Sequence, residues 1–399
     1  MPPARRRTPA VRAATAAKTS AARSPRAWRS ACRTAANREI TMNPNRPILL
    51  HAQRGFSLSE LMVAAAISLV ILAGMSTLFV NNNRAQAELE KANRQVENGR
   101  FAIQSLVSDL RNAGFYGEFD PTVLAAPAAV PDACALTVAA HAGALPLALQ
   151  GVDDAAAGAL ACIPDLLART DIIVVRRTAT CVAGSAGCAP VSDGGPFFQA
   201  SLCTNASELN SGDSANFYRL GIDTSGLDRH RRDCSAAAGS GTLAPVRRYL
   251  THIYFIARND RPADGVPTLK RLELVMDGSA LAHKLVPLVN GIENLQAEYG
   301  IDTGNDGVAD LFSANPASAS GCADAACAVA NWRNVVSLKL NLLARNIEPT
   351  IGHKDAKRYV LGLDAAGAEK VVEASGDAYK RHVFQTLVAL PNLAGRKTP

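Results

Sequence analysis

The sequence lacks the short motifs that mark the common enzyme classes. It contains no G-x-x-x-x-G-K-[ST] phosphate-binding loop, no G-x-S-x-G nucleophile elbow, no H-E-x-x-H zinc motif and no C-x-x-C pair. Its seven histidines are scattered along the chain, and the two in or near predicted strands, His252 and His382, are expected to be structural. These absences argue against an enzyme.

Acidic residues are almost missing from the first 54 positions, which hold 12 of the 42 Lys and Arg residues but one acid, Glu39. Residues 55–399 carry 30 basic and 34 acidic residues, so the net charge of +7 comes from the N-terminal stretch. Two basic runs lie further on, at residues 229–232 and 247–248, but no aromatic residues interleave with them for base stacking. We therefore predict solvated charge runs and no nucleic-acid partner.

Large apolar residues are rare in residues 1–41, which consist mainly of Ala, Arg, Thr and Ser and cannot form a core. Met42 offers a later start, with a leader of ordinary length for a targeting segment. The sequence leaves both starts open. The whole chain is 48% apolar and 19% charged, which excludes a disordered protein.

Charge is absent from Leu61 to Val80, a run of 20 residues. A helix of this length spans about 30 Å, the thickness of the hydrocarbon core of a bilayer. The arginines before the run, of which Arg54 is the last, predict a cytoplasmic N-terminal side. The rest of the chain is then expected outside the cytoplasm.

Proline is absent between Pro47 and Pro121, so a helix that begins near Phe56 can continue far beyond the apolar run. Apolar or small residues recur at spacings of 3 and 4, which predicts one buried helical face: Leu89, Ala92, Val96, Gly99, Ile103, Leu106, Leu110 and Ala113. The charged residues between them, including Asp109, are predicted to face solvent. The small members favour packing on the chain's own sheet over a coiled coil. Gly114 is expected to end the helix as its C′ residue.

Strands are predicted in the second half of the chain. Residues 121–168 have little pattern and are expected to be loop with a short helix. Apolar and alternating runs then predict seven strands: 172–177, 249–258, 269–276, 285–289, 295–299, 335–343 and 383–390. One long helix followed by strands without β-α-β alternation predicts an α+β fold with an antiparallel sheet.

Eight of the nine cysteines lie beyond the apolar run, and Cys32 lies in the leader. An even number outside the cytoplasm predicts disulfides, whereas the spacing fits no zinc site. Eight cysteines allow 105 pairings, so the connectivity stays open. Short loops favour Cys181–Cys188 and Cys322–Cys327, and this leaves Cys134–Cys162 and Cys203–Cys234.

A loop from Asp302 to Asp310 contains acidic or amide oxygens at spacings that resemble a calcium loop. Asp302, Asp306 and Asp310 stand at positions 1, 5 and 9, and Gly307 stands at position 6. Position 12 is Ser313, which cannot replace the bidentate Glu of such loops. The alternative is an ordinary Asp/Gly turn between strands. No other cofactor is predicted.

The segment from Arg54 to Val63, R-G-F-S-L-S-E-L-M-V, resembles the processing site of type IV prepilins. In that site a basic leader ending in Gly precedes Phe, a Glu at the fifth mature position and an apolar helix. Blocks further along, at residues 97–102, 109–115, 295–302 and 383–392, resemble the PilW family of type IV pilus minor pilins. The resemblance covers residues 42–118 and 285–393, and the cysteine-rich middle carries no motif of the family.

The resemblance implies that a prepilin peptidase cuts between Gly55 and Phe56 and methylates the new amine of Phe56. It implies a type IV pilin-like fold with four parts: a removed leader (1–55), a transmembrane or filament-core helix (56–80), the amphipathic half of that helix (81–114) and a periplasmic β-rich domain (115–399). The protein is then expected first in the inner membrane and later in an extracellular pilus.

The function that the resemblance implies is that of a non-catalytic minor pilin, which helps to prime pilus assembly and sits at the pilus tip. Its expected partners are other minor pilins, the major pilin, a tip adhesin and the prepilin peptidase. A minor pseudopilin of a type II secretion system shares the processing site and the architecture, and is the alternative.

Glu60 is the one charged residue between Phe56 and Val80, and two interpretations of it are open. The resemblance implies that its carboxylate neutralises the methylated Phe56 amine of a neighbouring subunit during assembly. Alternatively, Ser57 and Glu60 fit the capping box S-x-x-E, in which Ser57 caps the helix and Glu60 accepts from the Ser57 N–H.

Overall fold

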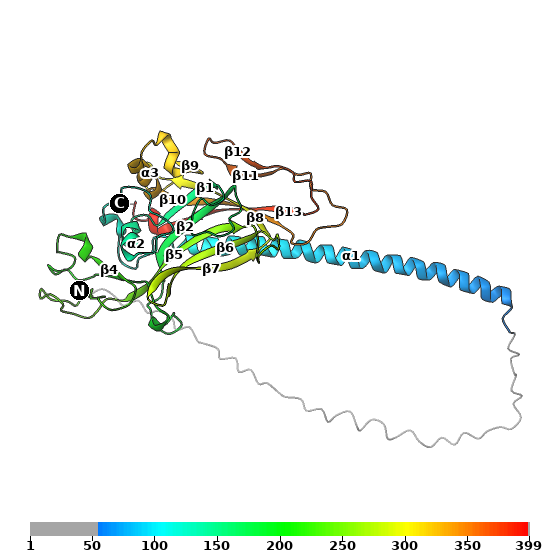
Figure 1. Cartoon of the computed structure of the whole chain (residues 1–399), viewed down its shortest axis with the longest axis horizontal. Coiled ribbons are helices and arrows are strands. Elements are labelled where there is room, and N and C mark those ends of the chain that lie inside the picture. The colour runs from blue at the N-terminus through cyan, green and yellow to red at the C-terminus, as the bar shows by residue number, and fades with distance from the viewer. Residues whose placement is uncertain (1–54, 398–399) are drawn as a thin grey trace, which may run out of the picture. The chain divides into compact units, whose positions relative to one another are not determined.

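Residues 55–397 are described by a computed structural model, in which one long helix precedes a set of β-sheets (Figure 1). The helix α1 (Leu58–Leu110) has 53 residues and runs without a break, as the absence of proline predicts. The chain divides into two compact units, Met1–Ala73 and Gly74–Pro399, and α1 contributes to both. The leader, the alternative start at Met42 and Cys32 lie outside the described residues, although Gly55 is within them.

The globular unit contains two main antiparallel sheets. The first has seven strands: β1 (Leu149–Ala155), β2 (Thr170–Thr178), β3 (Phe197–Ala200), β4 (Tyr218–Gly221), β5 (Val246–Ala257), β6 (Thr268–Asp277) and β7 (Ala280–Asn290). The second has four strands in the order β13-β10-β8-β9: β8 (Ile292–Ile301), β9 (Leu311–Ser313), β10 (Val335–Arg345) and β13 (Arg381–Ala389). The long strand β5 pairs with β2 and β6 along one part and with β3 along another.

Short elements complete the unit. A two-stranded sheet consists of β11 (Tyr359–Leu363) and β12 (Glu369–Val372). The short helices are α2 (Val138–Ala144), α3 (Ala325–Arg333) and α4 (Pro391–Ala394), with 3-10 turns at Pro121–Val123, Val191–Asp193, Ser214–Asn216 and Pro316–Gly321. Figure 1 shows α1 running beneath the sheets, so that helix and sheets enclose a common core.

The core lies where the C-terminal half of α1 packs on both main sheets. On the helix side, Ala102, Leu106 and Leu110 are fully buried. They share one apolar cluster with the inward side chains of β10, among them Leu338 and Leu340. The alternation of these side chains with polar ones is what predicted β10.

Small residues bring α1 close to the sheet, as the sequence predicts. A Cβ placed on Gly99 would lie 2.1 Å from Cε2 of Phe384 in β13, far inside van der Waals contact. Only glycine therefore allows the helix and this ring to approach so closely. A coiled coil, the alternative for this face of the helix, would not require such a contact with a sheet.

The α+β class and the seven predicted strands are confirmed, as β2, β5, β6, β7, β8, β10 and β13. The expectation of loop for residues 121–168 is wrong in part, because β1 lies there and pairs with β2. The alternation of apolar and polar residues in β1 is short. It includes Gly and two Asp residues, which are uncommon in strands and so weaken the prediction of a strand.

Two details of the helix prediction are also wrong. Leu89, predicted on the buried face, is 64% exposed. The helix ends at Leu110, because the N–H groups of Asn112 and Ala113 bond to carbonyls three residues back in a tighter turn. Gly114 has a φ of 72°, which suits glycine, but it lies beyond that turn, where its N–H donates to the carbonyl of Arg176 in β2.

Candidate functional site

The start of α1 forms the capping box that the sequence allows. The backbone N–H of Ser57 donates to Oε2 of Glu60 over 2.9 Å, and the N–H of Glu60 donates to Oγ of Ser57 over 3.2 Å. The Ser57 hydroxyl also donates to Oε2 of Glu60 over 3.1 Å. The two residues thus satisfy N–H groups that the first turn of a helix leaves unpaired. The role of Glu60 in assembly stays a prediction, in addition to its role in the capping box.

The predicted cleavage position is exposed. Phe56 is 88% exposed, and both Gly55 and Phe56 precede the first helical residue. Nothing among the described residues lies within 4 Å of a Cβ built on Gly55. The chain's own folding therefore gives no reason for glycine at this position. A requirement for a small residue there would come from an enzyme that must bind the segment.

The apolar half of α1 has its side chains exposed, with Val70 at 73% and Phe79 at 67%. Among the described residues, α1 is the helix whose length and composition would let it cross a membrane. An apolar surface of this length is unfavourable in water, so a bilayer or other apolar helices must cover it. This half of the helix supports membrane anchoring.

The other half of α1 carries a buried carboxylate that ties it to the first sheet. Asp109 is 4% exposed, so its predicted place on the solvated face is wrong. Its carboxylate lies 2.7 Å from Nδ1 of His252 and 2.6 Å from Nε of Arg177, and it accepts a 2.8 Å hydrogen bond from the Tyr254 hydroxyl. His252 is therefore structural, as the sequence predicts. The helical spacing from Gly99 to Asp109 could have revealed this register.

Burial alone would raise the pKa of Asp109, since a charged group loses hydration in the core. The interactions with His252 and Arg177 outweigh burial, and the hydrogen bond from Tyr254 adds to them. Together they hold the pKa of Asp109 well below its usual range. The carboxylate is therefore ionised at neutral pH, as a partner for the Arg177 guanidinium of β2.

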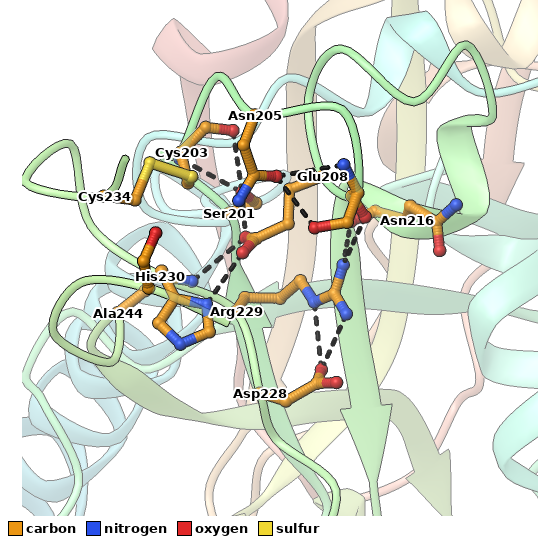
Figure 2. A network of polar contacts seen from close by, with 12 residues as sticks. Ser201, Cys203, Asn205, Glu208, Asn216, Asp228, Arg229, His230, Cys234 and Ala244 are labelled. Carbon is orange, nitrogen blue, oxygen red and sulfur yellow. Dashed lines mark hydrogen bonds and ion pairs between the residues drawn. A yellow bond between two sulfur atoms is a disulfide. The ribbon is translucent and has the colours of Figure 1, made fainter. Parts of the chain in front are cut away.

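The basic run at residues 229–232 is only half solvated, which corrects the sequence prediction. Figure 2 shows Arg229 and His230 inside a polar network of the cysteine-rich middle. Nδ1 of His230 lies 2.7 Å from Oε1 of Glu208, and the N–H of His230 donates to Oε2 over 3.0 Å. The Arg229 guanidinium donates to the carbonyl of Asn216 over 2.8 Å. These two residues organise loops rather than offer charge to a nucleic acid.

The eight cysteines beyond α1 form four disulfides, in the pairing that short loops favour. The bonds join Cys134 to Cys162, Cys181 to Cys188, Cys203 to Cys234 and Cys322 to Cys327. Cys203–Cys234 lies beside the Glu208 network in Figure 2. Closing a loop of about 30 residues contributes on the order of 3 kcal/mol to stability. The disulfides thus support loop regions that have little regular structure.

The carboxylates of the candidate calcium loop accept backbone N–H groups of the same loop. Asp302 accepts from Gly307 over 2.8 Å and from Asp306 over 3.3 Å. Asp310 accepts from the N–H of Thr303 over 2.8 Å and from the Thr303 hydroxyl over 2.7 Å. In residues 55–397, no three His, Cys, Asp or Glu side chains are grouped so that they could hold a metal ion. The turn interpretation accounts for these contacts, and calcium binding stays a prediction.

We expect melting curves of the protein in about 10 mM calcium and in chelator to superimpose. A loop ion with a dissociation constant near 10⁻³ M would add about 1.4 kcal/mol to stability at that concentration. A rise in Tm of several degrees that Asp310→Asn abolishes would contradict the turn interpretation.

Comparisons with known proteins agree with the description of the N-terminal segment and with that of the globular unit. A family model described as Type IV Pilus-assembly protein W matches residues 253–392, from β5 to α4. A model of the prokaryotic N-terminal methylation motif matches residues 50–76. Both matches confirm the resemblance that the sequence predicts.

The search of curated proteins gave no match. Among solved structures, a type IV-like pilin from Thermus thermophilus is similar, with 12% sequence identity and a TM-score of 0.31. The similarity covers 75% of this chain and 98% of that chain.

Proposed function

We propose that this protein is a minor pilin of the type IV pilus, a subunit without catalytic activity that helps to prime assembly and sits at the pilus tip. The observation that carries the proposal is the presence, in one chain, of the prepilin motif at residues 50–76 and the PilW region at residues 253–392. The exposed Gly55–Phe56 junction and the uncharged helix behind it support the same function.

The geometry suggests how such a subunit would be made. The basic leader stays in the cytoplasm, α1 inserts in the inner membrane, and the prepilin peptidase cuts before Phe56 and methylates its amine. The globular unit enters the periplasm, where an oxidising environment allows the four disulfides to form. Other minor pilins, the major pilin and a tip adhesin are the partners that this role requires.

Deleting the gene tests the function, with pili and type II secretion measured in the same strain. We expect the deletion strain to lose most surface pili and to secrete normally. Wild-type chain restores pili and appears in sheared pili in small amounts, beginning at a methylated Phe56.

Gly55→Glu is the matched variant, because the exposed position tolerates a side chain in the fold but a peptidase cleft would not. We expect it to accumulate as the longer precursor and to restore no pili. Normal pili with lost secretion would favour the pseudopilin alternative. An intact leader on wild-type chain in sheared pili would contradict processing itself.

A further inference from the structure

Ile351 is the most exposed large apolar side chain among the described residues, at 96%. It lies in the connection between β10 and β11, residues 346–358, where Ile347 is also exposed at 37%. A single exposed apolar residue is ordinary on a protein surface. Ile351 differs from such residues because of where its connection lies, next to α1.

The chain that leaves β10 follows α1 toward the start of the helix. Nε2 of Gln95 donates to the carbonyl of Ala344 over 2.7 Å, near the end of β10. One turn closer to the helix start, Nζ of Lys91 donates to the carbonyl of Pro349 over 3.0 Å. Figure 1 shows this connection alongside α1, at the end of the sheets where the helix emerges.

The last contact of this series fixes the residue before Ile351. The Thr350 hydroxyl donates to Oε2 of Glu88 over 2.7 Å, and Nζ of Lys380 lies 2.9 Å from the same oxygen. These hydrogen bonds, that from Lys380 above all, lower the pKa of Glu88 to about 2. Glu88 therefore stays ionised at neutral pH and accepts from Thr350, and the next residue, Ile351, is exposed to solvent.

The uncharged run of α1 ends at Val80, eight residues before Glu88. In a helix this separation is about 12 Å. The headgroup layer on each side of a hydrocarbon core is about 5–8 Å thick. With α1 inserted as far as Val80, Glu88 lies a few ångströms outside the headgroup layer. The headgroup layer is then within reach of the Ile351 side chain. The inference thus rests on the membrane stage of the proposed function.

The charge of this surface suits an acidic bilayer. Arg84, Lys354 and Lys357 are exposed cations. The carboxylates near them lie in ion pairs with cations of the chain: Glu88 with Lys380, Glu348 with Lys91, Glu373 with Arg358, and Asp355, Asp377 and Glu293 with the shared Arg381. Glu90 is exposed, but two residues from Glu88 it points about 200° around the helix, away from the connection.

We propose that residues 346–358 form a membrane foot, in which Ile351 enters the headgroup layer and Lys354 and Lys357 bind acidic phospholipid. The foot holds the globular unit against the periplasmic face of the membrane while α1 is inserted. Extraction of the subunit into a filament breaks this contact. An apolar side chain among cations is the usual composition of an interfacial segment.

Fluorescence quenching by brominated lipid tests the foot in the full processed chain. The variant Ile351→Trp is reconstituted in vesicles of phosphatidylcholine and phosphatidylglycerol, with and without bromine on the acyl chains. Trp28 leaves with the leader, and Trp332 is 2% exposed in the core, so brominated lipid cannot reach it and its emission is a constant background. We expect bromine to reduce the emission of the introduced indole about twofold, since interfacial segments enter about 5–10 Å deep.

Val308→Trp is the matched control. Val308 is 64% exposed in the loop between β8 and β9, outside the foot, and bromine should leave an indole there unquenched. Adding Lys354→Glu and Lys357→Glu to Ile351→Trp should remove the quenching. Vesicles of phosphatidylcholine alone should do the same.

Flotation of the chain with the vesicles in alkaline carbonate measures insertion separately. Normal flotation with an unquenched indole at position 351 would overturn the foot and leave the proposed function standing. Failure to float would overturn membrane anchoring and the foot together. Equal quenching at positions 351 and 308 would also overturn the foot, because it would indicate that the whole domain associates with lipid without preference.

Discussion

Glu60→Gln should leave the chain processed and inserted in the membrane but reduce its amount in sheared pili to background. An intramembrane carboxylate costs about 2.5–3.5 kcal/mol on insertion scales, less near a helix end, so it is expected to have a functional partner. The resemblance to prepilins implies that this partner is the Phe56 amine of a neighbouring subunit, and Gln cannot neutralise it. Gln still fills the capping box, because its carbonyl oxygen accepts from the Ser57 N–H.

Ser57→Ala is the opposite variant, since it removes the hydroxyl cap and keeps the charge of Glu60. Loss of an N-cap typically costs about 1 kcal/mol, which a helix of 53 residues tolerates. We expect this variant to enter pili near the wild-type level, as measured by immunoblotting of sheared pili and membranes. The reverse pattern, with Gln incorporated and Ser57→Ala excluded, would assign Glu60 to the cap alone.

Asp109→Ala should lower the free energy of unfolding of the globular unit by about 3–5 kcal/mol, the usual effect of removing one partner of a buried ion pair. The substitution leaves Arg177, His252 and Tyr254 without the acceptor that they share. Denaturant unfolding of the processed chain in detergent, followed by Trp332 fluorescence, measures this change. Glu97→Ala removes an exposed acid from the same helix and should change stability by less than about 0.5 kcal/mol.

The pH dependence of this difference identifies its cause. Because the pKa of Asp109 is lowered in the folded state, its stabilisation is complete above the ordinary pKa of about 4 and declines as the pH falls further. Wild type and Asp109→Ala should therefore converge in stability below about pH 4. A difference that is constant down to strongly acidic pH would indicate lost packing rather than lost charge.

The parts of the fold that the sequence predicts are those with a long, regular pattern. The proline-free helix and the alternating strand β10 are examples, since periodicity over many residues reports directly on burial. The short strands β3 and β4 cannot be predicted in this way, because four residues do not establish a period. They lie in the cysteine-rich middle, where disulfides compensate for a weak local pattern.

Charged residues mark the second limit of prediction. The sequence places Asp109 and Arg229 in solvent because isolated charges are rarely buried. Asp109 is buried with His252, which lies 143 residues away in the sequence. Arg229 is buried with a carbonyl of a neighbouring loop, that of Asn216, as one of its partners. Spacing along one helix or one loop cannot indicate such partners. The processing segment, in contrast, is a local motif, so the sequence contains all of it.

The close approach of Gly99 to Phe384 has a mechanical consequence. In the proposed pilus, tension along α1 would reach the globular unit through the backbone beyond Leu110 and through the side chains of α1 that interlock with the sheets. Residues 58–110 contain no cysteine, and no covalent cross-link can carry this force. The ring of Phe384 beside the helix backbone, with the hydrogen bond of Gln95 to Ala344 of β10, resists sliding of the helix in shear. The four disulfides join residues outside α1, so tension along the helix in the proposed pilus would load the helix–sheet contact before any of them.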